Sequence, residues 1–528
     1  MKIIQGLKNS KSSGVDYIDT ATVKLVAKDI LPAITHIINL SISQSTFPTM
    51  WKYAKVVPLL KKGDPLLAKN YRPVALLPIF SKVLEKAVFK QIVEYLDENK
   101  LLSHNHHGSR SGLSTATALV QMYDQWVQEV DHDKMVGVMM IDLSAAFDMV
   151  DHSLLVEKLT MFGLDENAVE WCRSYLLGRY QSVLIDGKMS PPVAIQFGVP
   201  QGSILGPLLY IIYTNDIPDL VHNHPVRYQS PHPACTPCGS TVCYVDDGTF
   251  SVSHTDTALL SQKLSDQYSK IADYMAANKL VINGEKTHLV VMGSKKSNNQ
   301  RRNVSLKAGT HVIHPTPTAK LLGAHISQDL KWNHHILGSE DSLIRQLTSG
   351  INGLSMLSSK ASMMTRLTVA NGIFMSKLCY LVQVWGGSEG FLLKSLQVLQ
   401  NRAARIVTGC GWFTPKRRLL RLCRWLSVKQ LVFYQSVIMA HKIAISRSPL
   451  YMASKMSTEH PRQTRQASSG CIRFGEDFSA HQNLIKRAFC HRATSQYNNI
   501  PAEIRGAKNL PSFKAKLKKW VESNVPLD

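Results

Sequence analysis

The sequence lacks any apolar run close to the roughly 20 residues that a membrane-spanning helix needs, and its longest run lies near Leu208 to Tyr213. Its start, Met1 to Ile4, leads into polar sequence instead of a secretory signal. The nine cysteines are irregularly spaced and form no disulfide framework. These absences argue against a membrane protein and against a secreted one. We therefore expect an intracellular protein of the nucleus, the cytoplasm or both.

One cysteine pair has a spacing that metal ligands use. Cys235 and Cys238 follow His222, His224 and His232. A structural zinc site needs four ligands within tetrahedral reach, and no second cysteine pair follows at a zinc-ribbon spacing. The stretch is rich in proline and histidine, which is typical of a surface loop. The sequence favours a loop over a zinc site here.

Acidic residues are scarce, above all in the last quarter of the chain. The net charge is +23, from 61 Lys and Arg against 38 Asp and Glu, and from Asn401 onward about 23 basic residues stand against about 6 acidic ones. Such an excess suggests a polyanionic partner held by salt-sensitive phosphate contacts, although a basic protein that is merely soluble has the same composition. With 528 residues, 44% of them hydrophobic, we expect two to four domains.

The most informative stretch that is present contains the adjacent carboxylates Asp246 and Asp247. They lie between two apolar runs, 241–245 and 249–252, which predict two short strands joined by an Asp-Gly turn. Alone, this pattern is ordinary turn chemistry. A third carboxylate, Asp142, directly follows an apolar run that predicts a buried strand. If that strand pairs beside the hairpin, the three carboxylates meet.

Three carboxylates packed together repel one another, and their pKa values rise unless cations neutralise them. Mg²⁺ suits such a set, because it is a hard ion held by a few carboxylates together with substrate phosphates. Two such ions activate an attacking hydroxyl and stabilise the leaving oxygen in an in-line phosphoryl displacement. The sequence therefore predicts two Mg²⁺ ions, with Mn²⁺ as a substitute, at Asp142, Asp246 and Asp247.

Three ordered segments resemble the A, B and C motifs of reverse transcriptases: residues 142–148, 198–207 and 244–247. Other stretches resemble the non-LTR retrotransposon branch, such as jockey- and CR1-like elements, and these are residues 70–74, 147–152, 283–287 and 321–323. The resemblance covers about residues 10 to 425. It implies an RNA-directed DNA polymerase, a nucleotidyltransferase that extends a primer 3′-hydroxyl with dNTPs on an RNA template. We expect no membrane association, and no protein partner can be inferred from the sequence.

The resemblance also implies roles for individual residues. The Leu143 carbonyl would add a metal ligand. Phe147 would act as a steric gate under the sugar, the alternative being a core aromatic. Gln201 and Gly202 would lie beside the incoming nucleotide and the template, where glycine lets the backbone approach closely.

Basic residues are expected around the triphosphate. Arg72 and Arg110 would grip it, because the guanidinium fork matches phosphate oxygens, although Arg110 also fits a solvated loop arginine. Lys286 would be the general acid for pyrophosphate departure. Family members usually carry Phe where Ser109 stands, which weakens the packing expected around Arg110.

The resemblance implies an α+β right-hand polymerase with fingers, an antiparallel split βαβ palm and a helical thumb. The expected parts are an N-terminal extension with fingers (1–135), the palm (136–335), the thumb (336–446) and a linker with a basic C-terminal segment (447–528). The reverse transcriptase domain would cover about 45–330. Apolar periodicity predicts helices over 80–96 and 259–275, a strand over 51–60, a palm hairpin over 181–197 and a further strand pair over 279–292.

Two alternatives remain at this stage. One is a decayed copy that only binds nucleic acid, which Ser109 and the lack of an upstream endonuclease favour, so we also expect a fragment or partial gene product. The other is a metal-dependent nuclease that uses the same carboxylates. The basic tail, around residues 513–520, fits a docking helix and a nucleic-acid contact equally well.

Overall fold

Strand β3 (Met135–Ile141) is the centre of the fold, and all seven of its residues are buried. It pairs antiparallel with β8 (Asp247–His254) on one side and with β9 (His288–Met292) on the other. β7 (Gly239–Tyr244) pairs with β8, which gives a four-stranded sheet in the order β7-β8-β3-β9. The computed structural model describes residues 1–61, 63–221, 239–294, 297–358, 360–457, 471–474 and 484–527.

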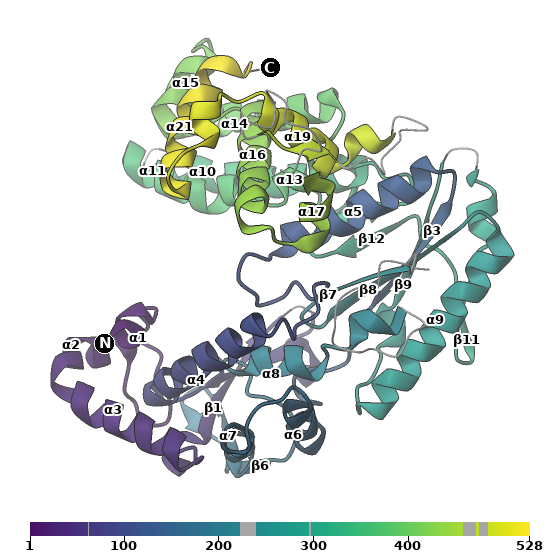
Figure 1. Cartoon of the computed structure of the whole chain (residues 1–528). Helices are drawn as coiled ribbons and strands as arrows, with labels where there is room; N and C mark the ends of the chain where they lie inside the picture. The colour runs from purple at the N-terminus through teal and green to yellow at the C-terminus, as the bar shows by residue number, and fades with distance from the viewer. Residues whose placement is uncertain are drawn as a thin grey trace.

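Helices cover both faces of this sheet (Figure 1). The even-numbered apolar residues of β3 belong to one core with α5 (Thr115–Asp131). The odd-numbered residues of β3 belong to a second core with α9 (Thr257–Ala277). The antiparallel sheet and the helix expected over 259–275 are confirmed, and α5 covers the opposite face of the sheet.

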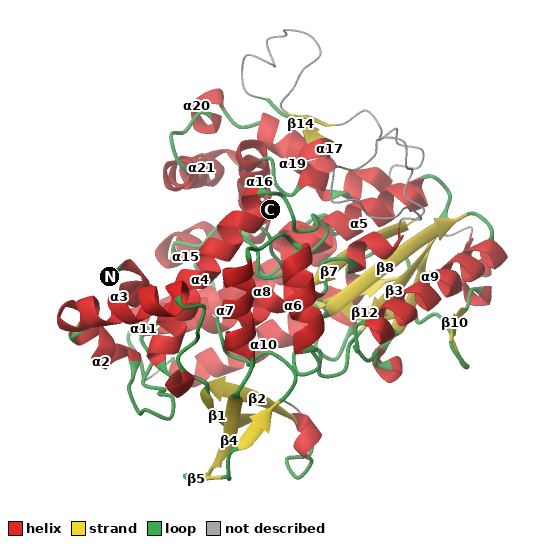
Figure 2. Cartoon of the chain, turned by 60° about the horizontal axis from the view of Figure 1, so that its bottom comes forward, coloured by secondary structure: helices red, strands yellow, loops and turns green. Residues whose placement is uncertain are grey.

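A second sheet lies apart from the central one, at the bottom of Figure 2. Its order is β2-β1-β4-β5, and β6 also pairs with β4. The expected hairpin at 181–197 belongs here and not to the catalytic sheet, because β4 pairs in parallel with β1. The strands are β1 (Tyr53–Leu60), β2 (Tyr71–Leu76), β4 (Arg179–Ile185), β5 (Lys188–Met189) and β6 (Val193–Ile195).

Helices surround both sheets in the first half of the chain. The helix expected over 80–96 is confirmed as α4 (Ile79–Glu98), which buries Leu84, Val88 and Ile92. Only one strand, β9, forms in the region 279–292, where a strand pair was expected. The other elements are α1 (Lys2–Gly6), α2 (Thr20–Leu25), α3 (Ala27–Ser43), α6 (His152–Met161), α7 (Glu166–Leu176), α8 (Gly206–Tyr213), β10 (Leu306–Ala308), β11 (His311–Ile313), β12 (Thr318–Leu321) and β13 (Ala324–Ser327).

From residue 343 onward the described chain is largely helical and forms the upper lobe of Figure 1. Its last helix, α21 (Leu510–Asn524), docks on α16 (Val428–Ser446) by burying Phe513, Leu517 and Val521. The His441 and Phe513 rings stack with centroids 3.5 Å apart. The other elements are α10 (Leu343–Leu357), α11 (Met363–Ala370), α12 (Ser376–Cys379), α13 (Val382–Trp385), α14 (Gly390–Thr408), α15 (Lys416–Cys423), α17 (Leu450–Lys455), β14 (Met456–Ser457), β15 (Arg473–Phe474), α19 (Phe489–Asn498) and α20 (Ala502–Arg505).

A buried carboxylate joins this lobe to α5. Asp124 accepts hydrogen bonds from the backbone N–H groups of Phe489 and Cys490, at 2.7 and 2.8 Å, where α19 begins. Burial raises the pKa of Asp124 to about 6, and the two backbone hydrogen bonds oppose that rise. Part of the expected linker, 458–470, lies outside the described residues, so the predicted domain boundaries stay predictions. In the described part of the chain, no helix is both long and apolar enough to cross a membrane.

Asp124→Asn tests the cost of burying this charge. The pKa of Asp124 is higher in the folded than in the unfolded protein, so its contribution to stability is full below about pH 4 and is lost as the pH rises through about 6. We expect the free energy of unfolding of the wild type, relative to Asp124→Asn, to fall by about 3 kcal/mol from pH 4 to pH 7 in urea titrations. Asp133→Asn, at an exposed position just after α5, should show no such trend.

Candidate active site

The tip of the β7–β8 hairpin is a two-residue turn. Tyr244 pairs with Asp247, so Val245 and Asp246 form the turn, and the expected Asp-Gly turn is wrong by two residues. Gly248 instead lies within the sheet, opposite Ile141 of β3. Val245 has a φ of 59°, a left-handed conformation that is unfavourable for a β-branched residue. The tip therefore holds a local strain that its surroundings must maintain.

A loop along the free edge of β7 maintains this strained turn. Cys243 donates a backbone hydrogen bond to Asn105 and accepts one from His107, at 2.9 and 2.8 Å. A Cβ atom at Gly108 would lie 2.6 Å from the backbone nitrogen of Val245, so only glycine fits against the tip. The loop is fixed in turn by the His107 ring, which hydrogen-bonds to Thr117 and Gln121 of α5.

The register of the central sheet brings the three carboxylates together. Ile141 lies opposite Gly248, so one further residue along each strand places Asp142 opposite Asp247. Partial burial, together with the charges of Asp246 and Asp142, raises the pKa of Asp247 to about 6. Asp142 and Asp246 therefore both lie close enough to act electrostatically on Asp247.

These carboxylates fit an open cation site better than a closed one. Among the described residues, no group of three or more His, Cys, Asp or Glu side chains is arranged to hold a metal ion by itself. Oxygen donors with mutual repulsion nevertheless suit a hard divalent ion that completes its shell with water and substrate phosphates. Leu143 and Ile282 form an isolated antiparallel bridge. The two hydrogen bonds of this bridge are made by the neighbouring residues, so neither of them uses the Leu143 carbonyl.

Lys286 reaches this site. Its ammonium lies 2.9 Å from Oδ2 of Asp142, and the lysine side chain is 60% exposed. Asn283 fixes this approach, because its backbone N–H donates to the Asp142 carbonyl at 2.9 Å and its side chain accepts from the backbone N–H of Lys286. The structure brings Lys286 to the carboxylates, while its role as a general acid stays a prediction.

Phe147 lies on a buried tyrosine. Its ring stacks on that of Tyr210 in α8, with centroids 4.7 Å apart and an interplanar angle of 26°. Burial raises the pKa of Tyr210 well above its usual value, and the charges of Asp246 and Asp247 contribute. Tyr210 therefore supports Phe147 next to the carboxylates. Sequence reasoning missed this residue, because it lies within a fully apolar helix where nothing distinguishes it from core.

The segment 198–206 connects the loop after Asp142 to the second sheet. Gln201 donates its side-chain N–H groups to both oxygens of Asp148 at 2.9 Å, and its carbonyl accepts from the N–H of Ala75. Gly202 has a φ of 122°, and a Cβ atom there would lie 2.6 Å from the Ala75 carbonyl oxygen. Gly198 has a φ of 85° and lies equally close to the Asp148 backbone. Both glycines are needed for close backbone approach.

Glu85 of α4, a residue that sequence reasoning missed, holds the end of this segment. It is fully buried, and its Oε2 accepts hydrogen bonds from the backbone N–H groups of Ile204 and Leu205, at 2.7 and 3.2 Å. Its other oxygen accepts from Ser81 at 2.7 Å. No sequence pattern pointed to Glu85, because its partners lie 119 and 120 residues away.

The two predicted phosphate-binding arginines differ in their surroundings. Arg72 lies exposed on β2, and its side chain makes no hydrogen bond or ion pair with any described residue. Arg110 is half-buried, and its guanidinium donates to the carbonyls of Ser103 and His106 within its own loop. Ser109 beside it is exposed, with a φ of 52°. An unpredicted cation, Lys61 after β1, is close enough to Asp247 to oppose the rise in its pKa.

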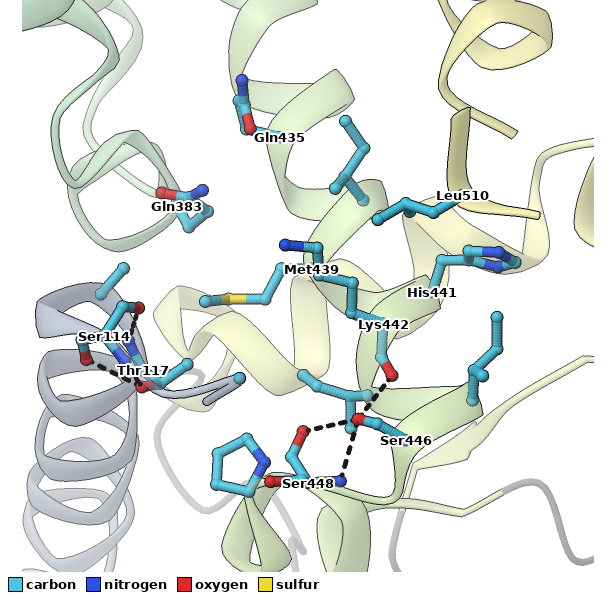
Figure 3. Close-up of a pocket in the computed structure, with 16 residues that line it drawn as sticks. Ser114, Thr117, Gln383, Gln435, Met439, His441, Lys442, Ser446, Ser448 and Leu510 are labelled. Atoms are coloured by element: carbon cyan, nitrogen blue, oxygen red, sulfur yellow. Dashed lines mark hydrogen bonds between the residues drawn. The ribbon is translucent and has the colours of Figure 1, made fainter. Parts of the chain in front are cut away.

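A separate pocket of about 390 Å³ lies between the start of α5 and α16 (Figure 3). Its polar groups largely satisfy one another, since Ser446 bridges the Lys442 carbonyl and Ser448. Burial lowers the pKa of His441 to about 4, so Lys442 is the charged group of its lining. This pocket has no carboxylates and is not the predicted site. Cys235, Cys238 and their neighbouring histidines lie outside the described residues.

Comparison with known proteins decides the family. The profile of "Reverse transcriptase (RNA-dependent DNA polymerase)" matches residues 59–326, which include all three carboxylates. The chain belongs to the reverse transcriptase family. The right-hand fold class and the family named from the motifs are thereby confirmed, whereas the individual site roles stay predictions.

Proteins similar to this chain include polymerases of mobile elements. This chain is 27% identical over 428 residues to the "Probable RNA-directed DNA polymerase from transposon X-element" of Drosophila melanogaster. The matched region covers 80% of this chain and 44% of the relative. The chain is 25% identical over 417 residues to the polymerase of the mobile element jockey of Drosophila funebris, with 79% and 44% covered. The chain thus spans less than half the length of these relatives.

A solved structure is also similar. The apo telomerase of Candida tropicalis matches with a TM-score of 0.42 and 13% sequence identity, covering 80% of this chain and 70% of the telomerase.

Glu85→Ala tests the support of the 198–206 segment. It leaves the N–H groups of Ile204 and Leu205 without their buried acceptor, which we expect to weaken local structure by about 3 kcal/mol. Amide hydrogen exchange of residues 204–206 should accelerate by about 100-fold. Glu94→Ala is the matched control, because Glu94 is on the same helix but is 57% exposed in an ion pair with Lys90. Equal protection in both variants would contradict this role of Glu85.

Proposed function

We propose that this chain is an RNA-directed DNA polymerase that adds deoxynucleotides to a primer 3′-hydroxyl by two-metal nucleotidyl transfer. The observation that carries the proposal is the pairing of β3 with β8, which sets Asp142 opposite Asp247 beside the Asp246 turn in a reverse transcriptase chain. The partners that follow are an RNA template, a DNA primer and dNTPs.

Asp142, Asp246, Asp247 and the Leu143 carbonyl are the groups proposed to hold two Mg²⁺ ions, with Mn²⁺ as a substitute. Bound there, such ions would lower the pKa of the primer hydroxyl and stabilise charge on the leaving oxygen. The Asp247 carboxylate, whose pKa is raised in the free protein, supports this, because a cation relieves the repulsion from its neighbours. The strained Val245 turn fixes the direction of Asp246 before substrate arrives.

The cations around the carboxylates suit a triphosphate. Lys286 already lies at Asp142, within reach of a leaving pyrophosphate to which it would give a proton. Lys61 acts on Asp247 from the end of β1, and the exposed Arg72 lies on β2, the strand paired with β1. Arg110 is the weaker candidate, because its guanidinium is engaged by loop carbonyls. Gln201 and Gly202 would border the nucleotide and the template, since their segment contacts the loop that contains Phe147.

Primer extension on an RNA template, with Mg²⁺ and dNTPs, tests the proposal. We expect extension by the wild type and a loss of at least about 10³-fold in the double variant Asp246→Asn with Asp247→Asn, because two of the three carboxylates proposed to hold the ions are removed. The matched control is Asp266→Asn with Asp273→Asn, which removes two exposed carboxylates from the nearby helix α9 and should leave extension unchanged.

Two results would contradict the polymerase. Binding of the primer–template by the wild type without extension would indicate a decayed copy. Degradation of the template without extension would instead indicate a metal-dependent nuclease, an activity for which a sugar gate at Phe147 has no use.

Phe147→Val tests the proposed sugar gate. The shorter side chain leaves room for a 2′-hydroxyl, so we expect the preference for dNTPs over rNTPs, measured as the ratio of kcat/KM values, to fall by about 10-fold or more. Phe391→Ala, at a half-exposed phenylalanine of α14, should leave the ratio unchanged. If Phe147→Val slows both substrates equally, the ring supports the core through Tyr210 and is no gate.

A further inference from the structure

The segment between α14 and α15 exposes two aromatic side chains to solvent. Trp412 is 74% exposed and Phe413 is 96% exposed. Neither ring contributes to the cores that the two flanking helices bury. Large rings that stay in water at adjacent positions, on a short connection between well-packed helices, mark a binding surface.

Arg405 holds one of these rings in place. Its guanidinium lies 4.8 Å from the centroid of the Trp412 ring, a cation–π distance. Arg405 belongs to the last turns of α14, so it fixes the ring against the helix from which the segment emerges. The indole is therefore arranged in advance, and less ordering is needed when a ligand binds.

The sequence that flanks this segment is basic and has no acidic residue. From Gly390 to Ser457 the sequence has 12 Lys and Arg and no Asp or Glu. On α15, Arg417, Arg418 and Arg421 are exposed while Leu419, Leu420 and Cys423 face the core. None of these three arginines forms a hydrogen bond or ion pair with any residue that the structure describes. We call Trp412, Phe413, Arg405, Arg417, Arg418 and Arg421 the aromatic–arginine surface.

We propose that the aromatic–arginine surface binds single-stranded RNA. A ring that projects into solvent can stack on an unpaired base, whereas the bases of a duplex already stack on one another. The three free arginines match the phosphates that accompany such bases. A protein partner would need a broader apolar patch, and here two rings are bordered by cations.

The position of the surface separates it from the catalytic carboxylates. In Figure 1, α15 lies at the top of the helical lobe, beside α21 and away from the labelled strands β7 and β8. Lys518 of α21 donates to the Arg424 carbonyl at the end of α15, so the two basic helices are in contact. The choice of RNA rests on the proposed function, since a template must be unpaired before it is copied. The surface would hold a part of that strand outside the catalytic site.

Binding without catalysis tests this inference. Fluorescence anisotropy with a labelled uridine 20-mer, in EDTA and without dNTPs, gives the Kd for the full chain. Trp412→Ala with Phe413→Ala should raise this Kd by at least about fivefold, the effect of losing one stacked base. Changing Arg417, Arg418 and Arg421 to Gln should raise it too and lower the slope of log Kd against log salt by about 2, since single strands lose about 0.7 per phosphate contact.

Tyr17→Ala is the matched control, because Tyr17 is a 77% exposed aromatic with the Lys55 ammonium 5.1 Å from its ring, but lies near the N-terminus. It should leave the Kd unchanged. The aromatic double variant should also bind an RNA–DNA duplex within about twofold of wild type, and its thermal unfolding midpoint should not shift, because both rings are exposed.

An unchanged Kd for the uridine 20-mer in both variants would overturn the inference, as would an equal loss of affinity in Tyr17→Ala. It would also be overturned if the aromatic double variant lost as much affinity for the RNA–DNA duplex as for the uridine 20-mer. A larger loss of affinity for a deoxyuridine 20-mer than for the uridine one would overturn it too. Primer extension separates this site from the proposed activity. A wild type that binds the uridine strand through these residues but extends no primer contradicts the polymerase and supports the RNA site. A wild type that extends primers while both variants bind RNA normally contradicts the RNA site alone.

Discussion

The antiparallel register between β3 and β8 is the constraint on which the catalytic site depends. It sets Ile141 opposite Gly248 and so brings Asp142 to Asp247. A slip by one residue would turn every side chain of β3 to the opposite face of the sheet. Gly137 opposes such a slip, because a Cβ atom there would lie 2.6 Å from the Leu264 side chain of α9. Packing against one helix thus determines the geometry of carboxylates several residues away.

Two helices, α8 and α19, have N-cap residues that make no capping hydrogen bond, and a distant carboxylate accepts from the N–H groups at each of these starts. The residues before α8 and α19, Leu205 and Ala488, make no side-chain capping hydrogen bond. Glu85 and Asp124 accept from backbone N–H groups at these starts instead. A buried charge is unfavourable unless it is hydrogen-bonded, and unpaired helix N–H groups are unfavourable too, so each satisfies the other. These pairs tie α8 to α4 and the C-terminal lobe to α5.

The sequence predicted those parts of the fold that local pattern determines. The apolar run before Asp142 correctly predicted a strand, and the periodicity of residues 80–96 and 259–275 correctly predicted helices. These predictions succeed because an element that buries one or both of its faces has a characteristic pattern of apolar residues in its own sequence. The Asp-Gly turn was wrong because the tertiary contact of Gly108 with Val245 overrides local turn preference. The hairpin at 181–197 forms as predicted, but its parallel pairing with β1 joins residues more than 100 apart and has no local signature.

The same limit applies to the candidate site. The three aspartates were predictable because carboxylates after strands are visible in sequence and resemble a known family. Tyr210 and Glu85 were not, since an apolar helix and a mid-helix glutamate look the same whether or not they face a site. What they do depends on partners that only the folded chain brings within 5 Å.

The free protein meets the repulsion among its carboxylates with its own cations. Lys286 binds one oxygen of Asp142, and Lys61 opposes the rise in the pKa of Asp247. Both lysines are largely exposed, so neither is fixed by burial and each can turn toward a more strongly charged partner. A dication bound by the carboxylates would weaken their hold on these ammonium groups by like-charge repulsion. The lysines would then be free to contact substrate phosphates, so that one set of charges serves the empty and the loaded site in turn.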